Sequence, residues 1–169
     1  MPRHTLEAAE KPLLDIFCDK YLFRIPSYQR PYAWTTEQAS ELLDDIVTAC
    51  GDTGEIADQS PYFLGSIVLI KSPTDPQAEV VDGQQRLTTL TILLAVLRDL
   101  ERGSVGEDIQ RSYICQEGSV TRGIPDSYRL SPRERDTAFF RENIQTDAAT
   151  ASLPQDRRRR GFQMRAVAS

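Results

Sequence analysis

Apolar residues recur at helical spacing in several segments of the chain, and this pattern predicts amphipathic helices. The helix expected from Arg86 to Leu100 is apolar around most of its circumference, which predicts a central and mostly buried position. Ser131 and Pro132 have the residue types of an N-cap and a first-turn proline for a later helix. The predicted helices are residues 11–20, 35–50, 86–100 and 133–144, with a weaker candidate at 108–117.

The segments between these helices have the composition of short strands. YLFRI at 21–25 is closed by a proline, and YFLGSIVLIK at 62–71 has the length and composition of a buried strand. AEVV at 78–81 leads directly into Asp82 and Gly83. Strands that alternate with helices predict an α/β fold.

The composition is that of a globular protein. The chain has 169 residues, of which 40% are hydrophobic and 27% charged, enough for one compact domain with or without a tail. No stretch approaches the roughly 18 consecutive apolar residues of a membrane span, and residues 1–12 lack the apolar centre of a signal peptide. The sequence therefore predicts a cytoplasmic protein with no membrane partner.

The net charge of −5 hides a difference between the two parts of the chain. Residues 1–120 contain 10 basic and 19 acidic residues, whereas residues 121–169 contain 10 basic and 6 acidic ones. The basic part includes four consecutive arginines: Arg157, Arg158, Arg159 and Arg160. Two interpretations stay open: the run contacts DNA phosphates, or it is a solvated tail, which is the commoner case.

The only histidine in the chain is His4. Its position excludes a Ser-His-Asp triad and a histidine-metal nuclease from the rest of the sequence. Any chemistry must therefore use carboxylates, amides, arginines, hydroxyls or a hard metal ion.

The motif DGQQR joins the last predicted strand to the central helix. The first N–H groups of a helix have no intrahelical partner, and the helix dipole adds partial positive charge, so this junction favours an anion. Gly83 permits a close approach of the backbone, and Arg86 can offer a forked pair of donors to a phosphate. The hydroxyl of Thr88, one turn further on, can add another donor.

The remaining polar residues of the motif suit phosphate chemistry. Gln84 and Gln85 carry amides that do not titrate near neutral pH, so they suit reading a sugar or base, or positioning a water near phosphate. Asp82 can bind a magnesium ion or orient the attacking water.

A second Gln-Arg pair lies in the loop IPSYQRPYAW, residues 25–34. Tyr28, Gln29 and Arg30 combine a guanidinium group with flat aromatic surfaces, which suits a nucleotide. We therefore expect Arg30 and Arg86 to converge on the phosphates of one nucleotide.

A purely structural interpretation is also open for both segments. Asp82 and Gly83 then form only a turn, with Asp82 capping the helix and the two glutamines in solvent. In the second segment, Trp34 then packs on the domain while Arg30 pairs with an acid such as Asp44 or Asp45.

Four sequence blocks together resemble the N-terminal domain of the GmrSD-type restriction family. They are IPSYQRPYAW, LLDDI, YFLGSIVL and VVDGQQRLTTLTILL, in this order and spacing, and a weaker likeness continues in RLSPRERDTAFF. The resemblance implies a ParB/sulfiredoxin-like α/β (α+β) fold, with a small mixed sheet flanked by helices and a helical C-terminal extension. It further implies a nucleoside triphosphatase, dependent on Mg²⁺, in a restriction system that acts on modified DNA. The matching residues are Asp82, Gly83, Gln84, Gln85 and Arg86, with Tyr28, Gln29 and Arg30.

Members of that family usually continue into an HNH-type nuclease domain. With one histidine, this chain does not contain that nuclease, so we expect it in a separate domain or subunit, or the chain to be a truncated fragment. The expected organisation is a DGQQR domain at 1–103, a partial helical extension at 104–146 and a basic, disordered tail at 147–169. Three functions stay open: a hydrolysing nucleotide sensor, a nucleotide- or DNA-binding adaptor without hydrolysis, and an inactive fragment.

Overall fold

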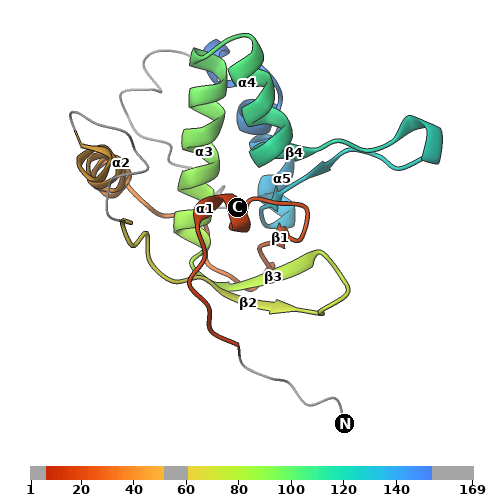
Figure 1. The fold of residues 1–169 in the computed structure, drawn as a ribbon, viewed down its shortest axis with the longest axis horizontal. Helices are drawn as coiled ribbons and strands as arrows, with labels where there is room; N and C mark the ends of the chain where they lie inside the picture. Colours follow the sequence, from red (N-terminus) through yellow and green to blue (C-terminus); the bar gives the residue numbers. More distant parts are fainter. Residues whose placement is uncertain (1–6, 52–60, 154–169) are drawn as a thin grey trace.

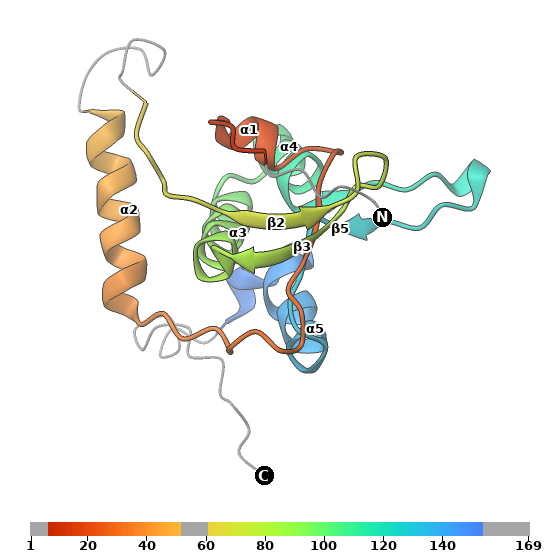
Figure 2. The same ribbon diagram turned by 90° about the horizontal axis from the view of Figure 1, so that it is seen from below.

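The computed structural model of the protein describes residues 7–51 and 61–153. A four-stranded mixed sheet with the order β2-β3-β1-β6 lies among helices (Figure 1), which confirms the predicted mixed α/β fold. Its strands are β1 (Leu22–Arg24), β2 (Val68–Lys71), β3 (Gln77–Asp82) and β6 (Leu130–Ser131). A separate two-stranded ribbon, β4 (Cys115–Gln116) with β5 (Ser127–Tyr128), extends away from the body (Figures 1 and 2).

The described part of the chain contains five α-helices. They are α1 (Leu13–Ile16), α2 (Thr36–Cys50), α3 (Gln84–Leu100), α4 (Ser104–Ile109) and α5 (Glu134–Phe140). The π-helical turns Gln110–Ile114 and Arg141–Gln145 continue α4 and α5, respectively. Short 3₁₀ turns lie at Val120–Arg122 and Thr150–Ser152. Helix α2 begins where its capping box predicts, because the Thr35 N–H donates to Gln38 Oε1 at 2.8 Å.

Strand β1 is central and runs parallel to both of its neighbours. Phe23 pairs with Ala78 of β3 on one side and with Leu130 of β6 on the other, whereas β2 is antiparallel to β3. The segments that follow β3, β1 and β6 therefore leave the sheet at the same edge. In open α/β sheets, this carboxyl edge is where ligands bind.

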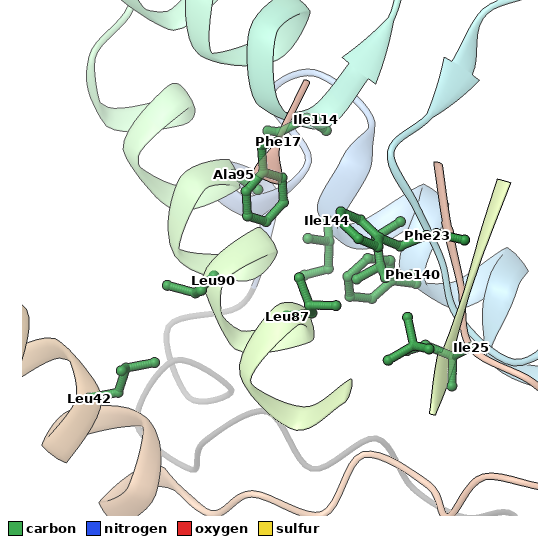
Figure 3. Packing of buried hydrophobic residues seen from close by; sticks show 13 residues of the cluster. Phe17, Phe23, Ile25, Leu42, Leu87, Leu90, Ala95, Ile114, Phe140 and Ile144 are labelled. Atoms are coloured by element: carbon green, nitrogen blue, oxygen red, sulfur yellow. The ribbon is translucent and has the colours of Figure 1, made fainter. Parts of the chain in front are cut away.

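The core lies between the sheet and α3 (Figure 3). Phe23 and Val80 of the sheet belong to one buried cluster with Leu87 of α3. The same cluster includes Phe140 and Ile144 from the segment after β6, both completely buried. Residues before and after position 103 thus share one core, and the division of the chain at that position stays a prediction.

Several sequence predictions are wrong in detail. Of the helix predicted at 11–20, only Leu13–Ile16 is helical. The strand predicted at 62–71 is present only from Val68, because Gly65 adopts a φ of 103° and residues 65–67 pack beside the start of α3 instead. The helix predicted at 108–117 gives way to strand β4 at Cys115. Ser131 is the last residue of β6 rather than a helix cap, and α5 is preceded by Arg133. Two-residue strands carry too little periodicity to be recognised in a sequence.

Two other predictions concern segments outside the described residues. They are the arginine run Arg157–Arg160 and most of the polar loop at 51–61. Within residues 7–51 and 61–153, no helix is both long and apolar enough to cross a membrane.

A buried ion pair fixes the end of α3. Arg98 is 2% exposed, and its Nε and Nη2 donate to the two carboxylate oxygens of Asp99 at 2.7 and 3.1 Å. Asp99 also accepts from the backbone N–H of Ala148 and Thr150. The further acceptors of Arg98 are Gln110 Oε1 and the carbonyl oxygens of Ile144, Gln145 and Thr146. The pair therefore joins α3 to the last described segment of the chain.

Replacing Arg98 with alanine should lower the free energy of unfolding by about 3–5 kcal/mol, because it leaves a buried carboxylate without its cation. Urea denaturation followed by circular dichroism measures this change. The matched control is Arg102→Ala, at an exposed arginine nearby, which should change stability by no more than about 0.5 kcal/mol. Equal stability of the two variants would contradict this role of Arg98.

Candidate functional site at the carboxyl edge of the sheet

Gly83 forms the junction between β3 and α3 in a conformation that favours glycine. Its φ of 86° lies in the left-handed region, and a Cβ atom there would lie 2.9 Å from the Ser66 carbonyl oxygen and 3.1 Å from Ile67 Cα. Asp82 is exposed, and its Oδ1 accepts the Gly83 N–H at 2.8 Å. The Asp-Gly pair thus lets the chain turn from strand to helix while residues 66–67 pack against it.

Gln84 and Gln85 are buried and hold the segment that follows β1. Gln84 Nε2 donates to the Arg30 carbonyl oxygen at 3.1 Å, and Gln85 Nε2 donates to that of Pro31 at 3.0 Å. Gln85 Oε1 in turn accepts the backbone N–H of Ala33 at 2.8 Å. The same oxygen accepts the next N–H, from Trp34, at 3.3 Å. This contradicts the alternative in which the glutamines lie in solvent.

Tyr28 and Gln29 attach the start of the same loop to β3. The Tyr28 hydroxyl donates to Glu79 Oε1 at 2.8 Å, and Gln29 Nε2 donates to the Val81 carbonyl oxygen at 2.8 Å. The hydrogen bond to the Glu79 carboxylate raises the pKa of Tyr28, which therefore remains a donor. Both side chains thus fix the start of the loop to strand β3.

Two threonines in the first turns of α3 are buried behind this loop. Thr88 Oγ1 donates to the Gln84 carbonyl oxygen at 2.8 Å, and Thr89 Oγ1 donates to that of Gln85. Tyr32 lies 3.0 Å from Thr89 Oγ1 through its hydroxyl. Burial raises the pKa of Tyr32, and the contact with Thr89 opposes this shift only in part.

Arg86 lies in the same first turn of α3 as Gln84 and Gln85, but its side chain contacts different residues. Its guanidinium carbon is 5.9 Å from the centre of the Trp34 ring, and a Cβ atom on Gly65 would lie 2.4 Å from its Nη1. Its Nε is buried without a hydrogen-bond partner among the described residues. The ion pairs found in residues 7–51 and 61–153 do not include Arg86. It is therefore a cation that keeps donors available for an anion.

A shallow recess lies between the loop after β1 and the start of α5. It has an empty volume of about 230 Å³, open in part to solvent. Arg133 Nε and Nη2 donate to Asp136 Oδ2 at 2.9 and 2.7 Å, and its Nη1 donates to the Gln29 carbonyl oxygen at 3.4 Å. The sequence pattern does not point to Arg133 and Asp136, because it predicts only the start of a helix for their segment. The residues that line the recess are Ile25, Arg30, Tyr32, Gln84, Gln85, Thr88, Pro132, Arg133 and Asp136.

The structure brings both Gln-Arg segments together but gives their arginines different neighbours. Arg30 lines the recess with Arg133, whereas Arg86 contacts Trp34 and Gly65. Convergence of Arg30 and Arg86 on one anion stays a prediction. The partly buried Trp34 packs on the core as its structural interpretation predicts.

The described residues do not form a carboxylate cluster for a metal ion. Residues 7–51 and 61–153 contain no group of three or more His, Cys, Asp or Glu side chains arranged to hold one. Magnesium at nucleotide sites usually takes only one or two protein carboxylates, with phosphate and water as its other ligands. The exposed carboxylate of Asp82 fits this lower requirement, since only one of its oxygens accepts the Gly83 N–H.

These observations define a mixed α/β domain with an arginine-rich polar site at the carboxyl edge of its sheet. The chain matches the family model of the GmrSD restriction endonuclease N-terminal domain over residues 13–165. It therefore belongs to this family. A comparison with curated proteins gives no significant match.

Gln85→Ala should release the loop at 30–34, because it removes the partner of one part-buried carbonyl and two N–H groups. We expect a loss of about 1–3 kcal/mol in the free energy of unfolding. A changed emission spectrum of Trp34, the only tryptophan, should report the release under native conditions. The control Gln77→Ala, at an exposed glutamine, should change neither quantity. Native emission and wild-type stability in Gln85→Ala would contradict the role of Gln85 in holding the loop.

Proposed function

We propose that this domain is the nucleotide-binding and nucleotide-hydrolysing sensor of a DNA restriction system. The ligand would be a nucleoside triphosphate bound with Mg²⁺ at the carboxyl edge of the sheet. Membership of a restriction endonuclease family supports the biological setting, and the arginines at the edge support the ligand class.

The observation that carries this proposal is the state of Arg86. Its Nε is buried without a partner among the described residues, at the first turn of a helix whose N-terminus favours negative charge. A buried donor without a partner costs free energy, so such a group is expected to have a ligand in the functional state. Phosphate suits the forked donors of arginine.

The other residues take roles that agree with their contacts. Arg30 is exposed at the recess and is free to bind a second phosphate oxygen. Asp82 would hold the magnesium ion, which neutralises phosphate charge when bound. Gln84 and Gln85 hold the loop that carries Arg30 and Trp34, and Tyr28 and Gln29 attach the same loop to β3.

DNA and a nuclease would be the partners of this domain. A restriction endonuclease cuts DNA, and this chain has no histidine beyond His4 for an HNH-type site. We infer that the nuclease lies in another domain or subunit and that nucleotide hydrolysis controls it. The run Arg157–Arg160 lies outside the described residues and remains a proposed contact to DNA phosphates.

A second candidate function is nucleotide binding without hydrolysis. It is favoured by Gln85, whose amide oxygen and nitrogen both bind the loop backbone and are thus not free to position an attacking water. Gln84 binds the loop through Nε2 alone. The protein would then act as a switch or adaptor that closes on a nucleotide.

Arg86→Ala should reduce phosphate release from ATP or GTP with Mg²⁺ at least about tenfold, because it removes the cation expected to stabilise phosphate charge. The assay is colorimetric detection of inorganic phosphate. Arg102→Ala is the control and should retain the wild-type rate. Equal rates in wild type and Arg86→Ala would overturn the assignment of this site.

Thermal melting separates the two candidate functions. A ligand that binds only the folded state stabilises it by about 2.7 kcal/mol when its concentration is 100 times its Kd. The hydrolysing sensor predicts a nucleotide-dependent rise in melting temperature together with phosphate release. The adaptor predicts the same rise with no release. No rise at millimolar nucleotide would contradict both.

A further inference from the structure

We propose that Arg133, oriented by Asp136, is a third arginine of the nucleotide site and binds a phosphate group. This inference rests on the proposed nucleotide-binding function. It adds a residue that follows β6, whereas Arg30 follows β1 and Arg86 follows β3. Its basis is the position of the residue just after strand β6, the hydrogen bonds of its guanidinium group and the shape of the recess.

The sheet topology brings Arg133 to the same edge as the two Gln-Arg segments. β1 pairs in parallel with β3 and with β6, so the segments after these three strands emerge side by side. The segment after β3 carries Arg86, the segment after β1 carries Arg30, and Arg133 comes two residues after β6. Each of the three parallel strands is thus followed by an arginine at the edge where ligands of such sheets bind.

The hydrogen bonds of Arg133 orient its guanidinium group without using all of its donors. The side chain is 11% exposed, and two of its N–H groups donate to Asp136 Oδ2. A third reaches the Gln29 carbonyl oxygen at 3.4 Å. A guanidinium group has five N–H donors, so one remains on each terminal nitrogen. A planar pair of donors of this kind suits two oxygens of one phosphate.

The charges around the recess favour an anion. Arg30 and Arg133 contribute two positive charges, and Asp136 contributes one negative charge that is already paired with Arg133. The N-terminus of α3, with Gln84 in the lining, adds partial positive charge. The enclosed part of the recess has room for about one water molecule, so it can admit phosphate oxygens but not a base. Phosphate therefore fits the recess better than the nucleoside.

Arg133 is a binding residue in this proposal, whereas a purely structural role would limit it to holding the Gln29 backbone. The two roles differ in their dependence on phosphate. If Arg133 binds phosphate, its removal should weaken the binding of ligands that carry a phosphate group. It should leave the binding of ligands that lack one unchanged. A structural role should weaken all ligands by the same factor and also lower the melting temperature.

The test compares three probes by calorimetry with Mg²⁺: inorganic triphosphate, a nucleoside triphosphate (ATP and GTP in parallel) and the corresponding nucleoside. Arg133→Ala should weaken binding of both phosphate-bearing probes about tenfold or more and leave any nucleoside binding unchanged. Arg133→Lys should recover part of the affinity, because it restores the charge without the fork. The matched control is Arg135→Ala, at an exposed arginine two residues further on in α5, and it should bind as wild type does.

The outcomes separate this inference from the function on which it rests. If the wild-type protein binds none of the phosphate-bearing probes, the proposed nucleotide function fails and this inference fails with it. If the wild type binds them and Arg133→Ala binds them equally well, only the role of Arg133 is overturned. A uniform loss of affinity for all probes, with a lower melting temperature, would also overturn it and assign Arg133 to loop support.

Discussion

The parallel pairing of β1 with both β3 and β6 is the constraint on which the site depends. β1 is only three residues long, yet it fixes the direction in which three polar segments leave the sheet. Its Phe23 pairs with Ala78 and Leu130, and all three side chains are buried in the core. The hydrophobic effect thus determines the register of the strands, and the register places the polar residues. A shift of one residue would exchange the buried and exposed faces of β1 and change how the three segments lie relative to one another.

The DGQQR motif combines two tasks that its polar composition does not distinguish. Gln84 and Gln85 bind backbone groups of the neighbouring loop, so they replace the water that this loop would otherwise need. Gly83 supplies the left-handed turn, and Gly65 leaves space for Arg86. Arg86 has no such internal partner among the described residues. The motif is therefore part scaffold and part proposed ligand site, and the scaffold part determines where Trp34 lies relative to Arg86.

The sequence predicts the parts of this fold that have a strong local signal. The apolar circumference of α3, the capping box at Thr35 and the strand before Asp82 are all found where their patterns place them. It also predicts that the two Gln-Arg segments meet. It does not predict β6 or the role of Arg133, because a two-residue strand has no readable period and its pairing with β1 joins positions about 107 residues apart in the chain. The site was thus predictable as far as its motifs reach, and the rest depends on long-range pairing.

Helix α3 connects the site to the far end of the domain because both of its ends are fixed by polar contacts. At its start, the amides of Gln84 and Gln85 bind the loop after β1. At its end, Arg98 and Asp99 bind the segment from Ile144 to Thr150. A helix whose sides are packed in the core cannot shift at one end alone, because close-packed interiors transmit displacement. Any movement of the loop that carries Arg30 on ligand binding must therefore either break the glutamine contacts or move the segment held by Arg98. The second route would link the proposed nucleotide site to the segment from Ile144 to Thr150.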